Sequence, residues 1–100
     1  MTKDTHITEV IFRVDKDGDV YALFPHEVCD YKGNVTSYQH IGQHSEADYN
    51  HCIRTSKNAT PTEALPLYQE LEGLGYNLEV IKRRRYDKYL KNFKELFILY

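Results

Sequence analysis

The sequence predicts an α+β fold, in which a mainly antiparallel sheet of about four or five strands carries two or three helices packed on one face. Apolar and polar residues alternate from His6 to Val14, which is the period of a β-strand. Residues 60–82 combine a helix start, a glycine stop and a second alternating run. From Tyr86 onwards, apolar residues recur at helical spacing. One hundred residues suffice for one core, so we expect a single domain spanning residues 1–100.

The N-terminal part predicts a β-hairpin. Even-numbered residues of 8–14 are expected on one face of the first strand, and odd-numbered residues of 7–13 on the other. The pentad 15–19 contains Asp17-Gly18, a strong hairpin signal. The returning strand is expected over Val20–Phe24 and is predicted to end at Pro25, because proline cannot donate to a strand ladder.

The next part predicts a second pair of extended segments, Glu27–Tyr31 and Val35–Ile41, around Lys32-Gly33-Asn34. Gly42 is expected to end this run. Ser45 and Asp48 resemble a capping box, which predicts a short helix over Glu46–Arg54. Residues 55–59 are then expected to form a polar loop.

Residues 60–82 carry the clearest local signals. Thr60 is a suitable N-cap, Pro61 then occupies the first helical position, and Glu63 completes a capping box. Pro66 lies inside the predicted helix and should kink it or separate its first turn. Gly75 is expected to stop the helix, and Tyr76–Ile81 alternates like a strand. The predicted element order is therefore β-β-β-β-α-α-β-α.

The C-terminal segment predicts an amphipathic helix on a basic element. Residues 1–75 hold six Lys/Arg and twelve Asp/Glu, a net charge of −6, whereas residues 76–100 hold seven and three, a net charge of +4. The sequence ends in an apolar run in which Ile98 and Leu99 extend beyond the stripe that one packed face requires.

This basic, aromatic helix, Arg83 to Tyr100, is the predicted contact surface of a non-enzymatic binding or regulatory module. Tyrosine and arginine are enriched at protein interfaces, and the chain holds nine tyrosines. The expected partner is another protein or a second copy of the chain, with nucleic acid as an alternative because cations and aromatics alternate here. The residues expected to make the contact are Arg83, Arg84, Arg85, Tyr86, Lys88 and Tyr89.

The segment from Tyr38 to Cys52 holds three of the five histidines and one of the two cysteines. It is the basis of an alternative hypothesis, a small metal-dependent or thiol enzyme. The candidate metal ligands are Cys29, His40, His44 and Cys52. Their spacing matches no zinc motif and the histidine beside Cys52 would point elsewhere on a helix, so the non-enzymatic interpretation is preferred and no cofactor is expected.

Two stretches, HIGQHS (40–45) and LYQELEGLGYNLEVIK (67–82), resemble small uncharacterised bacterial proteins, a resemblance that implies no particular activity or site residue. The N-terminal ten residues lack the apolar core of a signal peptide, which predicts a cytoplasmic protein with two free thiols. No apolar run approaches the roughly 20 residues that span a bilayer, so no membrane association is expected.

Overall fold

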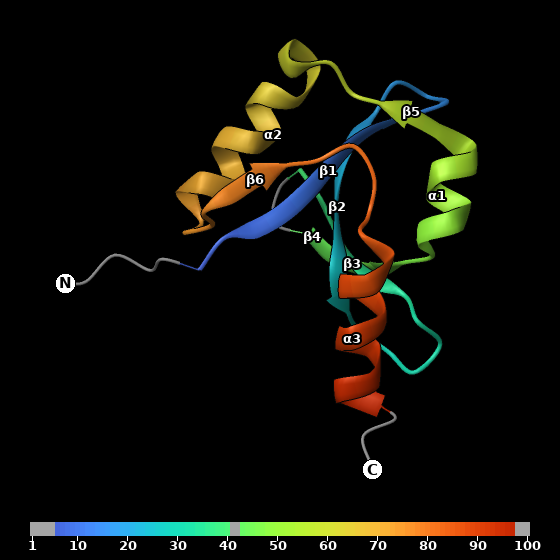
Figure 1. Ribbon diagram of the computed structural model, residues 1–100. Helices are drawn as coiled ribbons and strands as arrows, with labels where there is room; N and C mark the ends of the chain where they lie inside the picture. The colour runs from blue at the N-terminus through green and yellow to red at the C-terminus, as the bar shows by residue number, and fades with distance from the viewer. Residues whose placement is uncertain (1–5, 41–42, 98–100) are drawn as a thin grey trace, which may run out of the picture.

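The computed structural model describes residues 6–40 and 43–97 (Figure 1). Its sheet has the strand order β4-β3-β2-β1-β5, with β6 also paired to β1. The strands are β1 (Thr8–Asp15), β2 (Val20–Val28), β3 (Val35–Gln39), β4 (Gln43–Ala47), β5 (Ser56–Asn58) and β6 (Leu78–Val80). The helices are α1 (Tyr49–Thr55), α2 (Pro61–Gly73) and α3 (Tyr86–Phe97). All pairings are antiparallel except that of β1 with β6, so the predicted α+β class and mainly antiparallel sheet are confirmed.

Strand β1 shares one of its edges between two short strands. Residues 13–15 pair antiparallel with β5, and residues 8–10 pair parallel with β6. The carbonyl of Phe12 accepts from the Ala59 N–H at 2.9 Å, and that of Val10 accepts from the Ile81 N–H at 2.8 Å. This division adds a strand beyond the predicted number, because residues 56–58, expected as a loop, form β5.

Both hairpins close with the same turn. Asp15 Oδ1 accepts from the backbone N–H groups of Asp17 and Asp19, and Asp30 Oδ1 does so for Lys32 and Asn34. The glycine three residues after each aspartate has a positive φ, +86° at Gly18 and +87° at Gly33. Glycine adopts this conformation without the steric cost that a Cβ would bring. The two predicted turn positions are therefore confirmed.

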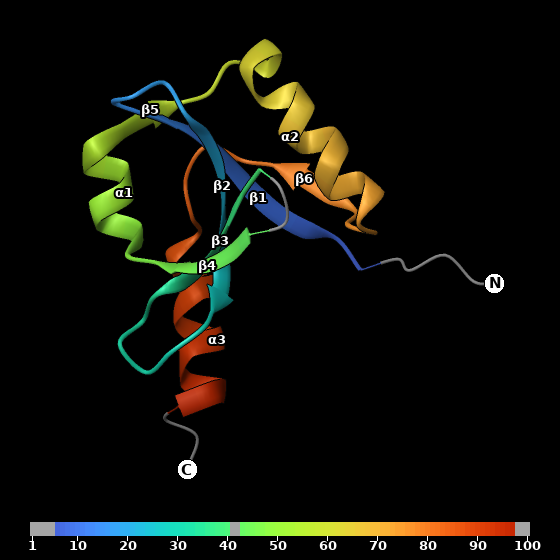
Figure 2. The same cartoon turned by 180° about the vertical axis from the view of Figure 1, so that it is seen from behind.

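The helices cover both faces of the sheet, so the prediction that they pack on one face is wrong (Figures 1 and 2). Helix α2 packs its buried residues Ala64, Leu67 and Leu71 over Val10, Phe12, Ala22, Phe24 and Tyr38. The opposite face holds Ile11, Leu23 and Val35 and is covered by Tyr49 of α1 and Tyr89 of α3. The alternation in β1 was predicted correctly, but the face that carries Glu9 and Arg13 is covered as well.

Helix α2 begins as predicted. Thr60 Oγ1 accepts from the Glu63 N–H at 3.1 Å, and Glu63 Oε1 accepts from the Thr60 N–H at 2.8 Å. The helix runs unbroken through Pro66, so a separate first turn, one of the two predicted outcomes, is not observed. Pro66 is exposed, which allows its ring to lie on the solvent side of the helix. Gly75 follows the cap Leu74 with φ +105° and ends the helix as expected.

Three local predictions were wrong. Pro25 does not end β2; it is buried within the strand, where the register with β3 shifts between Phe24 and Val28. A bulge tolerates proline because the ladder is interrupted there. Ser45 is not a helix cap but part of β4, and Asp48 caps α1 by accepting from the His51 N–H at 3.2 Å. Helix α1 therefore begins three residues later than predicted.

The predicted stop at Gly42 and the apolar residues Ile98, Leu99 and Tyr100 lie outside the described residues. Among the helices that are described, none has the length and apolar character needed to cross a membrane.

Candidate interaction surface on the C-terminal helix

The segment before α3 is attached to α1 through Arg84. The backbone N–H of Arg84 donates to the hydroxyl of Tyr49 at 2.9 Å, and Tyr49 is buried. The guanidinium of Arg84 lies 4.4 Å from the centroid of the Tyr49 ring and 4.0 Å from that of Tyr89. A guanidinium at this distance from aromatic faces is attracted to their negative quadrupole. Arg84 therefore joins α1 to α3 within the molecule.

Glu9 of β1 lies beneath the first turn of α3. Its side chain is 7% exposed; Oε1 accepts from Lys88 Nζ and lies 3.3 Å from His26 Nδ1, and Oε2 lies 3.2 Å from Arg85 Nη2. Burial opposes the charged form, but the hydrogen bond and charge of Lys88, with the charges of His26 and Arg85, outweigh it and lower the pKa of Glu9. Within residues 6–40 and 43–97, Oε2 receives no hydrogen bond. Glu9 is thus a buried carboxylate held by cations of the C-terminal segment.

His26 of β2 completes this anchor. Its Nε2 accepts from the backbone N–H of Arg85 at 2.8 Å, so the proton of a neutral ring resides on Nδ1, which faces Glu9. Burial, helped by the charges of Lys88 and Arg85, lowers the pKa of His26 although Glu9 acts in the opposite sense. The carbonyl of His26 accepts from Asn92 Nδ2 at 2.6 Å. A protonated ring would lose the bond to Arg85, so this contact requires neutral His26.

Tyr89 fixes α3 against the second hairpin. Its hydroxyl donates to the carbonyl of Gly33 at 3.0 Å. A Cβ built on Gly33 would collide with this hydroxyl, so the absence of a side chain there permits the approach of the helix. The docking residues of α3 and its approach are thus Arg85, Lys88, Tyr89 and Asn92.

Helix α3 docks off the centre of its apolar stripe. A helix turns by about 100° per residue, which places the mean direction of the docking residues roughly 90° away from the middle of the stripe. No side chain of α3 is buried. Figure 1 shows the last turns of α3 extending past the end of β2. The apolar residues left largely or partly open, here called the uncovered stripe, are Tyr86 (57% exposed), Leu90, Leu96 (60%) and Phe97 (42%).

The predicted contact residues therefore divide into two groups. Arg84, Arg85, Lys88 and Tyr89 have partners inside the molecule. Arg83 and Tyr86 are exposed; the centroid of the Tyr86 ring lies 6.0 Å from that of Tyr89 and 5.6 Å from the guanidinium carbon of Arg84. Glu9 and His26, which dock the helix, were missed by sequence reasoning. The signal that could have found Glu9 is a carboxylate on the same face of β1 as Ile11, which is fully buried.

The candidate metal ligands lie apart. His40 Nδ1 lies 2.5 Å from Glu70 Oε1, and His44 Nε2 lies 3.0 Å from the Tyr76 hydroxyl, both on the α2 side of the sheet. Cys29 is exposed in the second hairpin, whereas Cys52 belongs to α1 on the other face. These four residues do not form a common ligand set.

A different cluster unites Cys29 with Asp30 and Glu46, whose possible ligand atoms all lie within 4.8 Å of one another. The side chain and charge of Asp30 raise the pKa of Glu46, and burial, followed by Asp30 and Glu46, raises that of Cys29. A thiol with a raised pKa is a poorer nucleophile and metal ligand at neutral pH.

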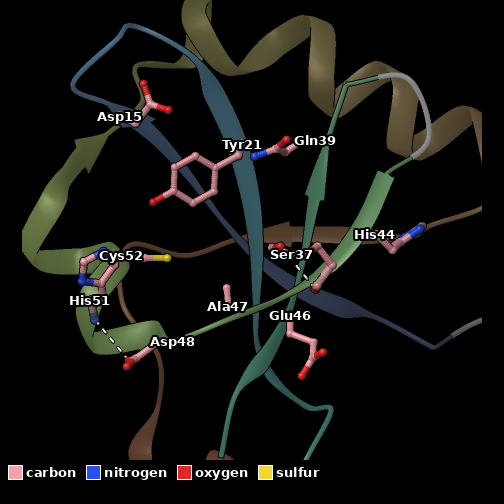
Figure 3. Close-up of a pocket in the computed structure, with 11 residues that line it drawn as sticks. Asp15, Tyr21, Ser37, Gln39, His44, Glu46, Ala47, Asp48, His51 and Cys52 are labelled. Atoms are coloured by element: carbon pink, nitrogen blue, oxygen red, sulfur yellow. Dashed lines mark hydrogen bonds between the residues drawn. The ribbon is translucent and has the colours of Figure 1, made fainter.

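The segment 38–52 does line a cavity of about 780 Å³ between α1 and the sheet (Figure 3). Tyr21 and Cys52 face this space, whereas His44 and Glu46 point away from it. The Tyr21 hydroxyl donates to Ser56 Oγ at 3.1 Å, and burial raises its pKa. In the described part of the chain no histidine is hydrogen-bonded to either cysteine, so the nucleophile–base pair of a thiol enzyme is not assembled here.

Arg13 closes one side of this region and was also missed from sequence. It is 6% exposed and donates to Ser56 Oγ (2.8 Å), Asn58 Oδ1 (2.6 Å) and the carbonyls of Ser56 (2.6 Å) and Ile53 (3.2 Å). All four acceptors are neutral oxygens. Arg13 therefore connects β5 and the end of α1 to β1, and among the described residues it has no ion-pair partner.

Comparison with protein-family models, curated proteins and solved structures gives no match for this chain.

Proposed function

We propose that this chain is a non-enzymatic protein-interaction module and that α3 is its contact element. The observation that carries the proposal is the uncovered stripe: the most amphipathic helix of the chain docks with no buried side chain, and Leu96 remains 60% exposed. Contiguous exposed apolar surface of this kind is typical of interaction sites. Aromatic anchors such as Tyr86 and Phe97 are frequent hot spots.

The charges beside the stripe favour an acidic partner. Arg83, Lys91 and Lys94 are exposed, and of these only Lys91 has an ion-pair partner in the described residues, Glu95 at 4.0 Å. The body of the molecule, residues 1–75, carries a net charge of −6. A second copy of the chain thus offers the complementary charge, and we take self-association as the form of the interaction.

Nucleic acid is the weaker alternative. Three of the predicted contact cations, Arg84, Arg85 and Lys88, already have aromatic or carboxylate partners within the molecule. Arg83, Lys91 and Lys94 remain for phosphate contacts, which dominate nucleic-acid affinity, whereas the net charge of the whole chain is −2. A binding constant that falls steeply with salt would favour this alternative instead.

Sedimentation velocity over a wide range of protein concentration tests the proposal. The wild-type chain should form dimers at high concentration, and the double variant Leu96→Glu with Phe97→Glu should remain monomeric with an unchanged circular dichroism spectrum. Leu74→Glu is the matched control, because Leu74 is similarly exposed (57%) but follows α2. A wild-type chain that stays monomeric up to roughly 1 mM, where binding energies are only about 4 kcal/mol, contradicts the proposal.

A further inference from the structure

A second, apolar depression lies on the other side of the sheet, between α2 and β6. Its volume is about 380 Å³, within the range of small-molecule sites. Figures 1 and 2 both show α2 running beside β6 above the edge of β1. The lining residues are Phe12, Asn58, Ala59, Pro61, Ala64, Leu65, Tyr68, Val80, Ile81 and Lys82. None of these residues belongs to the uncovered stripe or docks α3.

The depression arises from the divided edge of β1. On one side, the chain after β5 turns away from β1 beyond the hydrogen bond from the Ala59 N–H to the Phe12 carbonyl. On the other side, the chain after β6 turns away beyond the hydrogen bond from the Ile81 N–H to the Val10 carbonyl. Ala59 and Ala64 are too small to fill the space that opens between these segments. Phe12, 3% exposed, forms part of the lining and packs against the Tyr68 ring at 6.2 Å between centroids. Leu65 (51% exposed) and Val80 (54%) offer apolar surface that a ligand would remove from water.

Each polar side chain of the lining can donate a hydrogen bond. Lys82 is exposed and has no ion-pair partner in the part of the chain that the structure describes. The Tyr68 hydroxyl likewise makes no hydrogen bond there. The oxygen of the Asn58 side chain is occupied by Arg13 Nη1, so its amide N–H groups are the remaining polar atoms. No aspartate or glutamate lines the depression.

From apolar walls combined with polar side chains that can all donate a hydrogen bond and include no carboxylate, we infer that this depression binds a small aliphatic carboxylate, with its hydrocarbon chain over Phe12 and Leu65 and its carboxylate at Lys82. The buried guanidinium of Arg13, which has no ion-pair partner within residues 6–40 and 43–97, adds positive potential through Asn58. A cationic amphiphile would instead be repelled by the charges of Lys82 and Arg13. The inference is independent of the function proposed for α3.

Titration of ¹⁵N-labelled protein with octanoate at pH 7, followed by NMR, tests this inference. Octanoate should cause saturable shifts at the amides of Ala59, Tyr68 and Ile81, and octylammonium, with the same chain, should bind at least tenfold more weakly. Lys82→Glu should weaken octanoate binding at least tenfold. Lys57→Glu, which changes an exposed lysine of β5 outside the depression, should not.

Two results would overturn the inference. Equal binding of octanoate, octanol and octylammonium would show that the apolar walls bind the hydrocarbon chain whatever its head group. Shifts centred on α3 rather than on Ala59 and Ile81 would place the site at the uncovered stripe. The Leu96→Glu, Phe97→Glu variant separates the two proposals, because it should abolish dimers yet retain octanoate binding.

Discussion

Glu9 and His26 come from adjacent strands and hold the start of α3 together: His26 Nδ1 lies 3.3 Å from Glu9 Oε1, while Nε2 of the same ring accepts from the Arg85 N–H. Each group has a defined proton state in this arrangement. Glu9 must be ionised to form an ion pair with Lys88, and His26 must be neutral to accept from the Arg85 N–H. The position of α3 therefore depends on two titratable side chains of the sheet.

Glu9→Gln should lower the free energy of unfolding by about 2 kcal/mol, because it removes the charge that holds Lys88, Arg85 and His26 in a buried setting. Urea unfolding followed by circular dichroism measures this change, and hydrogen exchange should show reduced protection in α3. Glu79→Gln is the control. Its carboxylate is 54% exposed and lies 3.9 Å from Arg85, so a change of no more than about 0.5 kcal/mol is expected. Equal effects of the two variants would argue against the anchor.

Stability should fall on acidification in two steps. The pKa of His26 is lowered from 6.5, so below about pH 6.5 the unfolded chain takes up a proton that the folded chain resists, and stability declines towards the folded pKa. The pKa of Glu9 is lowered from 4.5, so its contribution is complete above that pH and is lost as pH falls through the folded pKa. Above pH 7 neither group should change stability.

Unfolding at pH 7 and pH 5 in wild type and His26→Gln tests the first step. Glutamine keeps a donor and an acceptor but does not titrate. Between pH 7 and pH 5 the free energy of unfolding of the variant should therefore fall by roughly 1 kcal/mol less than that of the wild type. An identical pH slope in wild type and His26→Gln would contradict the assignment.

The two turn glycines provide a matched pair. Gly18→Ala should lower the free energy of unfolding by about 1 kcal/mol. Alanine adopts φ +86° only with strain, but its Cβ would meet nothing within 4 Å. Gly33→Ala should cost more, about 2 kcal/mol or above, because its Cβ also collides with the Tyr89 hydroxyl. Hydrogen exchange should show α3 loosened only in Gly33→Ala. Equal costs, with α3 intact in both, would mean that Tyr89 can move without penalty.

Pro66→Ala should stabilise the chain by about 1 kcal/mol, because alanine restores an N–H that can donate to the carbonyl of Thr62 within α2. Thermal and urea unfolding measure this gain. Pro61→Ala is the control: at the first helical position a proline loses no helical bond, so the change should be neutral or slightly destabilising. A loss of stability in Pro66→Ala would show that the proline ring contributes packing that its exposure does not suggest.

Local signals predicted the parts of the fold that depend on neighbouring residues. The Thr60–Glu63 capping box, the glycine turns and the faces of β1 follow from groups a few positions apart. Strand β5 could not be predicted in this way, because residues 56–58 extend only by pairing with Arg13 and its neighbours, more than 40 residues away. The predictions for Pro25 and Ser45 were wrong for the same reason, because a bulge in β2 and the edge strand β4 both depend on pairing with β3.

The candidate surface was predicted only in part. The stripe of α3 is visible in the spacing of its apolar residues, but its docking angle is set by Glu9 and His26, which the sequence does not mark. Arg84 and Lys88 resembled free surface cations because their partners, Tyr49 and Glu9, come from distant elements. Their positive charge is evident from the sequence, but their partners within the molecule could not be predicted from it.

The parallel pairing of Thr8 with Leu78 and of Val10 with Val80 affects how the chain folds while it is being synthesised. On the ribosome the hairpin of β1 and β2 emerges long before β6 exists, so the N-terminal part of the outer edge of β1 stays open through most of synthesis. Pairings of such sequence separation are slow to form, and an open strand edge invites wrong partners. The nascent hairpin should therefore be a substrate for chaperones that protect unpaired strands, and truncated chains that end before Leu78 should aggregate more readily than the full chain.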